Sequence, residues 1–133
     1  MYFTMIYGVV NVRSGLLRLS QAGHPGPALQ RPGADVRILG AGGVPIGMLP
    51  AVEYEQLEVM LQRGDRLFLY SDGVTECTNS CSVPFHEKRL IECLKRCESA
   101  SLAETLASVE RDLRAWNGNA EFTDDVSLLA LEY

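Results

Sequence analysis

Long runs of one charge and long apolar segments are both absent from this sequence. The formal net charge of −5 is spread along the chain, which argues against nucleic acid as a partner, because phosphate binding needs a basic stripe. No apolar segment approaches the roughly 20 residues that cross a bilayer, and no basic segment followed by an apolar one forms a leader. We therefore expect a cytoplasmic protein that binds neither nucleic acid nor membrane.

Repeats, low-complexity segments and linkers are missing as well, so nothing divides the chain. Its 133 residues suit one domain that can bury a core. With 47% hydrophobic and 22% charged residues, it has the composition of an ordinary globular protein.

Cysteine is scarce, and the four present form two Cys-x3-Cys pairs, Cys77 with Cys81 and Cys93 with Cys97. A zinc or iron–sulfur site is one interpretation, because four thiolates can close a tetrahedron. Structural zinc sites favour two intervening residues in at least one pair, however, and no His closely flanks either pair. We interpret all four as reduced, structural thiols and predict that they bind no metal.

Strand patterns dominate the first half of the chain. Runs of apolar, aromatic and β-branched residues bounded by Gly, Pro and Asn predict strands over residues 2–12, 16–21, 28–30, 35–39, 54–61, 66–71 and 126–133. In the strand over 54–61 we expect four side chains to face inward, those of Tyr54, Leu57, Val59 and Leu61.

Two helix patterns lie between the last two of these strands. Residues 86–97 place Leu90 and Leu94 on one face. Residues 101–116 begin with Ser101 as the N-cap and Glu104 at the capping-box position. Strands joined by hairpins, then two helices and a closing strand, indicate an α+β fold with antiparallel sheets and helices on one side.

Acidic residues occur at the ends of two of the predicted strands. The strand over 66–71 stops at Asp72-Gly73, and Glu76 follows shortly after. Asp124 directly precedes the closing strand. One interpretation is an ordinary Asp-Gly turn that leaves a strand. A carboxylate at the mouth of a buried strand is costly unless a positive group holds it there, however, and a bound cation is such a group.

Asp72 and Asp124 are therefore the candidate metal ligands, and no other catalytic or cofactor-binding residue is predicted. Oxygen-only ligands suit hard cations such as Mg²⁺ or Mn²⁺. Water bound by two such ions becomes a nucleophile toward a phosphoryl group, which needs no covalent protein nucleophile. We expect the two carboxylates to lie within roughly 4 to 7 Å of each other. His24, in a rigid Gly-His-Pro loop, is interpreted as structural.

Five segments carry a family resemblance when taken in order: residues 3–9 (FTMIYGV), 21–27 (QAGHPGP), 45–49 (PIGML), 64–76 (GDRLFLYSDGVTE) and 123–129 (TDDVSLL). Each is loose alone, but the five together are specific. They resemble the C-terminal half to two-thirds of the metal-dependent serine/threonine protein phosphatases, in the bacterial branch similar to sporulation stage II protein E.

The resemblance implies a portion of an α-β-β-α sandwich, with two mostly antiparallel sheets, flanking helices and a two-metal centre at one edge. It implies hydrolysis of phosphoserine or phosphothreonine on a small anti-sigma-factor antagonist, in bacterial partner-switching signalling, with Mn²⁺ or Mg²⁺ as the cofactor. Asp72 matches the ligand of the family's Asp-Gly motif, and Asp124 matches the ligand of its late Asp-Asp motif.

One family motif has no counterpart here, an earlier aspartate that bridges both ions. We therefore expect residues 1–133 to be the C-terminal portion of a phosphatase domain whose N-terminal part is absent, with self-association through the open edge. The alternative is a non-catalytic, phosphatase-like module that binds sigma-factor regulators. The presence of both Asp72 and Asp124 favours the enzyme.

Overall fold

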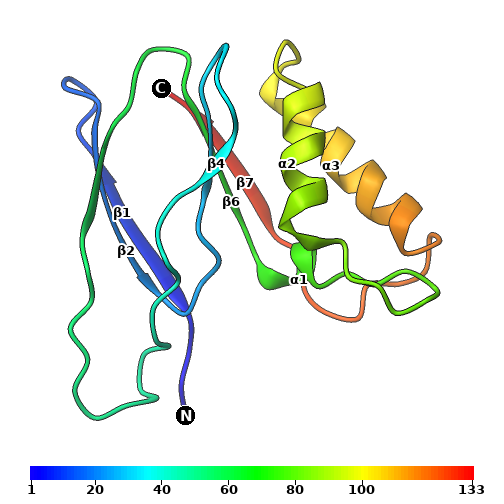
Figure 1. Cartoon of the computed structure of the whole chain (residues 1–133), viewed down its shortest axis with the longest axis horizontal. Coiled ribbons are helices and arrows are strands. Elements are labelled where there is room, and N and C mark those ends of the chain that lie inside the picture. The colour runs from blue at the N-terminus through cyan, green and yellow to red at the C-terminus, as the bar shows by residue number, and fades with distance from the viewer.

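Two antiparallel sheets and one layer of helices make up the chain, in a computed structural model that describes residues 1–133 (Figure 1). The strands are β1 (Met5–Val10), β2 (Leu16–Ala22), β3 (Ala28–Gln30), β4 (Arg37–Ile38), β5 (Leu57–Met60), β6 (Arg66–Tyr70) and β7 (Leu128–Glu132). The helices are α1 (Asp72–Thr75), α2 (His86–Arg96) and α3 (Leu102–Trp116). None of the helices has the length and hydropathy needed to span a membrane.

The first sheet has the strand order β1-β2-β5. A tight turn joins β1 to β2, in which the Asn11 side chain accepts hydrogen bonds from the backbone of Arg13 and Ser14. Such local bonding by Asn stabilises turns. The hairpin register pairs Tyr7 with Ser20 and Val9 with Arg18, so these four side chains share one face of the sheet.

The second sheet has the order β4-β3-β6-β7, with β6 in its interior. Both faces of β6 are covered, which explains its continuous apolar run. Leu67 on one face joins the apolar core between the sheets, and Phe68 and Tyr70 on the other face join the core beneath the helices. The acidic segments at the ends of β6 and β7 are thus carried by the more deeply buried of the two sheets.

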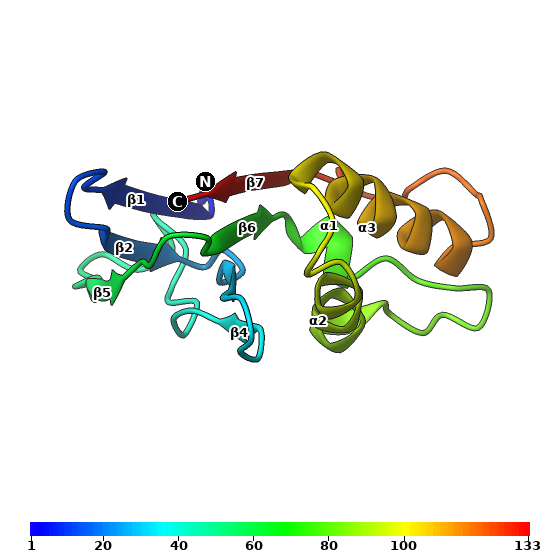
Figure 2. The same ribbon diagram turned by 90° about the horizontal axis from the view of Figure 1, so that it is seen from above.

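Helices α2 and α3 cover the second sheet. The α3 helix begins with the predicted capping box, in which Ser101 and Glu104 bond each other's backbone N–H. Leu90 and Leu94 of α2 and Val109 of α3 are fully buried against the sheet. The layers run from the first sheet through the second sheet to the helices, and no helix lies over the outer face of the first sheet (Figures 1 and 2).

A buried ion pair joins the two sheets at one corner. Arg31, directly after β3, contacts the carboxylate of Asp65 at 2.7 Å and also donates to the backbone oxygen of Met60 in β5. The Asp65 side chain is 1% exposed. Burial opposes ionisation of Asp65, but hydrogen bonds from Arg31 and from the backbone of Gln62 outweigh it and lower the Asp65 pKa below its usual value.

The sheets and helices confirm the predicted α+β class, and two predictions of local structure are wrong. Tyr54 is exposed, because β5 begins only at Leu57, where pairing with β2 starts. Asp72-Gly73 does not form a simple turn but begins the one-turn helix α1. The other strands are confirmed, β3 with the expected bounds, β2 one residue longer and the rest shorter, as in the closing strand, which is confined to Leu128–Glu132.

Candidate metal centre

Helix α1 places two acidic side chains on one face. The chain leaves β6 at Tyr70, passes Ser71 as the N-cap and forms a single turn that ends with Glu76 at the C-cap. The backbone N–H of Glu76 donates to the oxygen of Asp72 at 2.9 Å. Residues four apart in a helical turn are neighbours on its surface, so the Asp72 and Glu76 carboxylates point the same way.

Pairing of β6 with β7 brings the second acidic segment beside α1. Tyr70 pairs with Leu128, and the ladder continues as Ser71 N–H donates to the oxygen of Ser127 at 3.0 Å. The Ser71 hydroxyl donates to the backbone oxygen of Asp125 at 2.9 Å and accepts from Ser127 N–H at 2.9 Å. Ser71 therefore joins the segment that carries Asp72 to the segment that carries Asp124.

Glycine at position 73 is required by space. A Cβ atom built there would overlap the backbone oxygen of Asp125. Gly73 is buried at this contact, and its φ is not positive, so the close approach of the two segments is the reason for glycine rather than an unusual backbone conformation.

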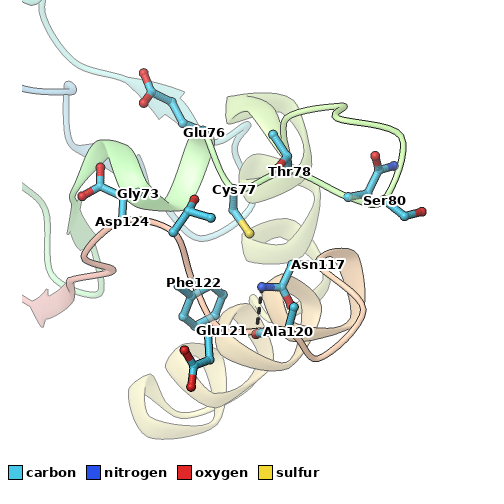
Figure 3. Close-up of a pocket in the computed structure, with 12 residues that line it drawn as sticks. Gly73, Glu76, Cys77, Thr78, Ser80, Asn117, Ala120, Glu121, Phe122 and Asp124 are labelled. Atoms are coloured by element: carbon cyan, nitrogen blue, oxygen red, sulfur yellow. Dashed lines mark hydrogen bonds between the residues drawn. The ribbon is translucent and has the colours of Figure 1, made fainter.

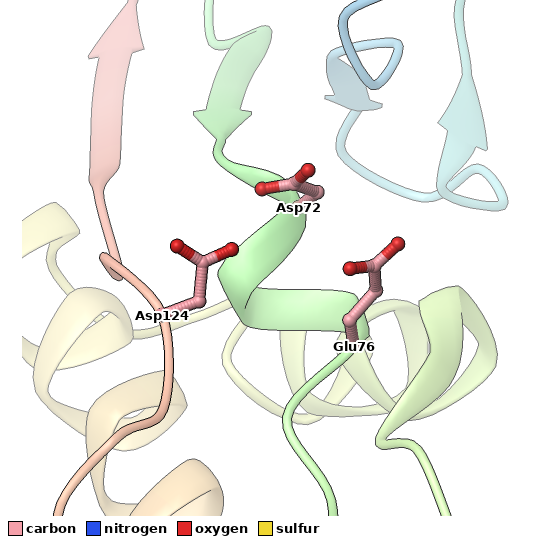
Figure 4. Close-up of side chains that lie close together, drawn as sticks. All are labelled: Asp72, Glu76 and Asp124. Carbon is pink, nitrogen blue, oxygen red and sulfur yellow. The ribbon is translucent and has the colours of Figure 1, made fainter.

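Asp72, Glu76 and Asp124 together form a cluster of carboxylates (Figure 4). One oxygen from each residue lies within 4.8 Å of the others, and all three side chains are exposed. None of the seven ion pairs in the structure includes any of them. Three like charges at this distance repel one another, and no ion pair offsets that repulsion.

This donor set fits a hard divalent cation. All the donor atoms are carboxylate oxygens, which Mg²⁺, Mn²⁺ and Ca²⁺ prefer, and their exposure leaves room for the water ligands that Mg²⁺ retains. Oxygens that share one such cation lie roughly 3 to 5 Å apart, given bond lengths of about 2.0 to 2.6 Å. The cluster needs little rearrangement to reach that separation.

Of the residues considered from the sequence, the structure brings Asp72 and Asp124 together and adds Glu76. The spacing between Asp72 and Glu76 places them on one face only if the segment is helical, and its residues do not predict a helix. The Asp125 side chain lies outside the cluster. His24 is in the loop after β2, where its Nδ1 lies 2.9 Å from the oxygen of Pro25.

The four cysteine side chains do not form one cluster. Cys77, Cys93 and Cys97 are buried and Cys81 is exposed, all with free thiols. No three potential metal-binding atoms of these cysteines lie together. Burial raises the pKa of Cys93 to about 12, so its thiol stays protonated.

Comparison with protein families gives a match over the whole chain. The family model described as Stage II sporulation protein E (SpoIIE) matches residues 1–133. Protein IcfG of Synechocystis is 29% identical over 133 residues, covering 98% of this chain and 20% of that protein. Phosphoserine phosphatase RsbU of Bacillus subtilis is 35% identical over 78 residues, covering 58% of this chain and 23% of that protein. The chain thus spans about a fifth of the length of these relatives.

A solved structure shares the fold. The SiaA-PP2C domain of Pseudomonas aeruginosa superposes with a TM-score of 0.82 at 22% identity. The match covers 98% of this chain and 52% of that one. The two antiparallel sheets and their helical layer therefore share the fold of the matched part of that structure.

Proposed function

Because this chain belongs to the Stage II sporulation protein E family, within the PP2C-type phosphatases, we propose that it takes part in metal-dependent hydrolysis of phosphoserine or phosphothreonine on another protein. The carboxylate cluster of Asp72, Glu76 and Asp124 carries the proposal, because it supplies oxygen ligands at one accessible point. The name of RsbU as a phosphoserine phosphatase supports the same reaction.

We propose that these three carboxylates hold Mn²⁺ or Mg²⁺. When bound, the cation offsets the charge of the phosphoryl group and lowers the pKa of a bound water, which makes that water a nucleophile. The protein's own contribution is to fix the ligands. Helix α1 sets the spacing of Asp72 and Glu76, and the Ser71 hydrogen bonds hold the segment of Asp124 against it. Preorganised ligands lose less freedom when they bind the cation.

The same proposal makes residues 1–133 the C-terminal portion of a phosphatase domain. The match to about half of the SiaA-PP2C chain supports this. The size of the cluster supports it as well, because two cations need more ligands than three carboxylates provide. A complete two-metal centre would then take further acidic ligands from a segment outside these residues.

The substrate that we propose is a small regulatory protein of the anti-sigma antagonist type, in the cytoplasm. The family resemblance of the five segments supports the substrate class. Four free thiols support a reducing compartment.

Metal binding by single variants tests the proposal. We expect Asp72→Asn and Asp124→Asn each to weaken Mn²⁺ binding roughly 10- to 100-fold by titration calorimetry, because each removes a charged ligand. Asp125→Asn is the matched control, since it removes the same charge one residue away and outside the cluster. In a polypeptide that carries the complete domain, the same two substitutions should abolish Mn²⁺-dependent release of phosphate from a phosphoserine peptide. Unchanged Mn²⁺ affinity in both variants would contradict the proposal.

A second candidate function is a non-catalytic module that binds sigma-factor regulators. One observation favours it, namely that no fourth acidic side chain joins the cluster of three. The two functions differ in one measurement. Stable binding of a phosphorylated antagonist, without release of phosphate in saturating Mn²⁺, would support the module over the enzyme.

A further inference from the structure

A groove of about 430 Å³ runs directly beside the carboxylate cluster (Figure 3). One wall is the segment 76–80 after α1, and the other is the segment 117–124 after α3. Glu76 and Asp124 belong both to the groove and to the cluster. Its volume lies in the range of sites that bind small ligands or short peptide segments.

Hydrogen bonds hold both walls in place without a ligand. The indole N–H of Trp116, at the end of α3, donates to the oxygen of Val83 at 2.9 Å and so joins the helix that leads into one wall to the loop that follows the other. The Asn79 side chain accepts from the backbone of Cys81 and Val83 at 3.0 Å each, which shapes its loop. The Asn117 side chain donates to the oxygen of Ala120 at 3.0 Å, as Figure 3 shows. The groove is therefore formed before anything binds.

The lining of the groove has one sign of charge. Its polar side chains are mostly amides and hydroxyls, and its apolar members are Cys77, Ala120 and Phe122. The charged residues are Glu76, Glu121 and Asp124, and no Lys or Arg lines it. In the proposed function Glu76 and Asp124 are offset by the cation, which leaves Glu121 as the free charge of the groove.

We infer that this groove binds the polypeptide segment next to the phosphorylated residue, and that Glu121 makes it select basic over acidic side chains there. The inference rests on the proposed function, because a phosphoserine held at the cluster brings its neighbours to the groove. Glu121 is exposed and has no partner in any ion pair. A Lys or Arg in the segment gains an attraction from it, and an Asp or Glu is repelled.

Reversing the charge of Glu121 and of the residues beside the phosphoserine tests the inference. Two phosphoserine peptides are compared with the 133-residue chain, identical except for Lys or Glu at the two positions on each side of the phosphoserine. We expect the wild type to prefer the Lys peptide by about threefold to tenfold in binding, measured by fluorescence anisotropy, since each exposed pair contributes modestly. Glu121→Lys should remove or invert this preference. Glu53→Lys is the matched control, because it makes the same change in net charge at a residue that lines no part of the groove.

A second readout separates this inference from the proposed function. Mn²⁺ affinity, measured by titration calorimetry for each variant, reports the carboxylate cluster alone and is independent of the flanking residues of the peptide. If the wild type does not bind Mn²⁺, the proposed function fails, and the anisotropy still tests the groove. An unchanged preference in Glu121→Lys, or an equal change in Glu53→Lys, would overturn the inference. Ser80→Trp, which adds bulk at the opposite wall, should weaken binding of both peptides, and undiminished binding would also overturn it.

Discussion

The two sheets of this molecule differ in what covers them. The interior strands β3 and β6 of the second sheet are buried on both faces, and this sheet supports the acidic cluster at one end, under helices in which Val109 is completely buried. The first sheet packs on one face only. On its outer face Met5, Tyr7, Val9 and Met60 are between 41% and 63% exposed. The interior of the second sheet is thus close-packed on both sides, whereas the first sheet presents an apolar surface to water.

The corner where the two sheets meet should show the largest effect. Arg31→Met leaves the buried Asp65 carboxylate without its cation, and we expect a loss of about 2 to 4 kcal/mol in the free energy of unfolding. Arg18→Met is the control, because it breaks an exposed pair with Glu58 on the first sheet and should cost at most about 1 kcal/mol. Urea denaturation measures both. Equal losses would mean that the buried corner contributes no more than an exposed pair.

This difference should also depend on pH. The lowered pKa of Asp65 stabilises the wild type above roughly pH 4, the ordinary value for Asp, and that stabilisation is lost as the pH falls through the Asp65 pKa. In Arg31→Met, burial is no longer offset and Asp65 protonates more readily. The deficit of the variant should therefore shrink between pH 6 and about pH 3, and a constant deficit would contradict the assignment.

A matched pair of substitutions compares the two regions directly. Val109→Thr places a hydroxyl in the core beneath the helices and should cost about 1 to 3 kcal/mol, whereas Val9→Thr on the bare sheet should change stability by less than about 0.5 kcal/mol. Val and Thr have similar sizes and similar helix and strand propensities, so propensity does not explain a difference in stability between the two variants. Thermal unfolding of both variants measures it. A Val9→Thr loss equal to that of Val109→Thr would show that the outer face is covered in solution.

The outer face of the first sheet should associate with itself. We expect the wild type to form oligomers at concentrations near 100 μM, because β1 is an edge strand with exposed apolar side chains. Tyr7→Lys should weaken this association by about tenfold, since a charge at an apolar contact is desolvated. Ala107→Lys on the exposed side of α3 is the control. Analytical ultracentrifugation measures the association of each variant, and a wild type that stays monomeric would disprove the prediction.

The smallest effect concerns the thiols. Cys77, Cys93 and Cys97 all lie in the core beneath the helices, and burial raises the pKa of Cys77 and Cys93, so these groups react slowly. We expect iodoacetamide to label one thiol per chain rapidly, at the exposed Cys81. Cys81→Ser should abolish the rapid phase and change stability by less than about 0.5 kcal/mol. Rapid labelling of two or more thiols would show that the helical cover opens readily.

Much of the fold is predictable from the sequence because each strand and helix carries its own local signal. The capping box at Ser101 and the apolar run of β6 are examples, and both are confirmed. The errors occur where local and long-range effects compete. Tyr54 lies in a segment with the composition of a strand, but its own backbone pairs with no neighbouring strand. Helix α1 is a single turn of Asp-Gly-Val-Thr, which by propensity favours a turn, and it exists because Val74 is buried beneath α2.

The acidic cluster is less predictable than the fold. Asp72 and Asp124 are identifiable as candidates from their places at strand ends, but their proximity depends on the pairing of β6 with β7, which no local pattern specifies. Glu76 is not identifiable as a candidate ligand from the sequence, because its position beside Asp72 follows from α1. The groove lined by Glu121 lies between two loops that have no sequence periodicity at all.

The pairing of β6 with β7 also sets the order of events during synthesis on the ribosome. Asp72, Glu76 and both long helices leave the ribosome before Asp124 and Leu128. The nascent chain can fold its helices against β6, but the third carboxylate has no position until β7 has emerged and paired. An incomplete chain therefore carries the helical layer without the cluster. The proposed ion-binding site therefore forms later than the helical layer that lies beside it.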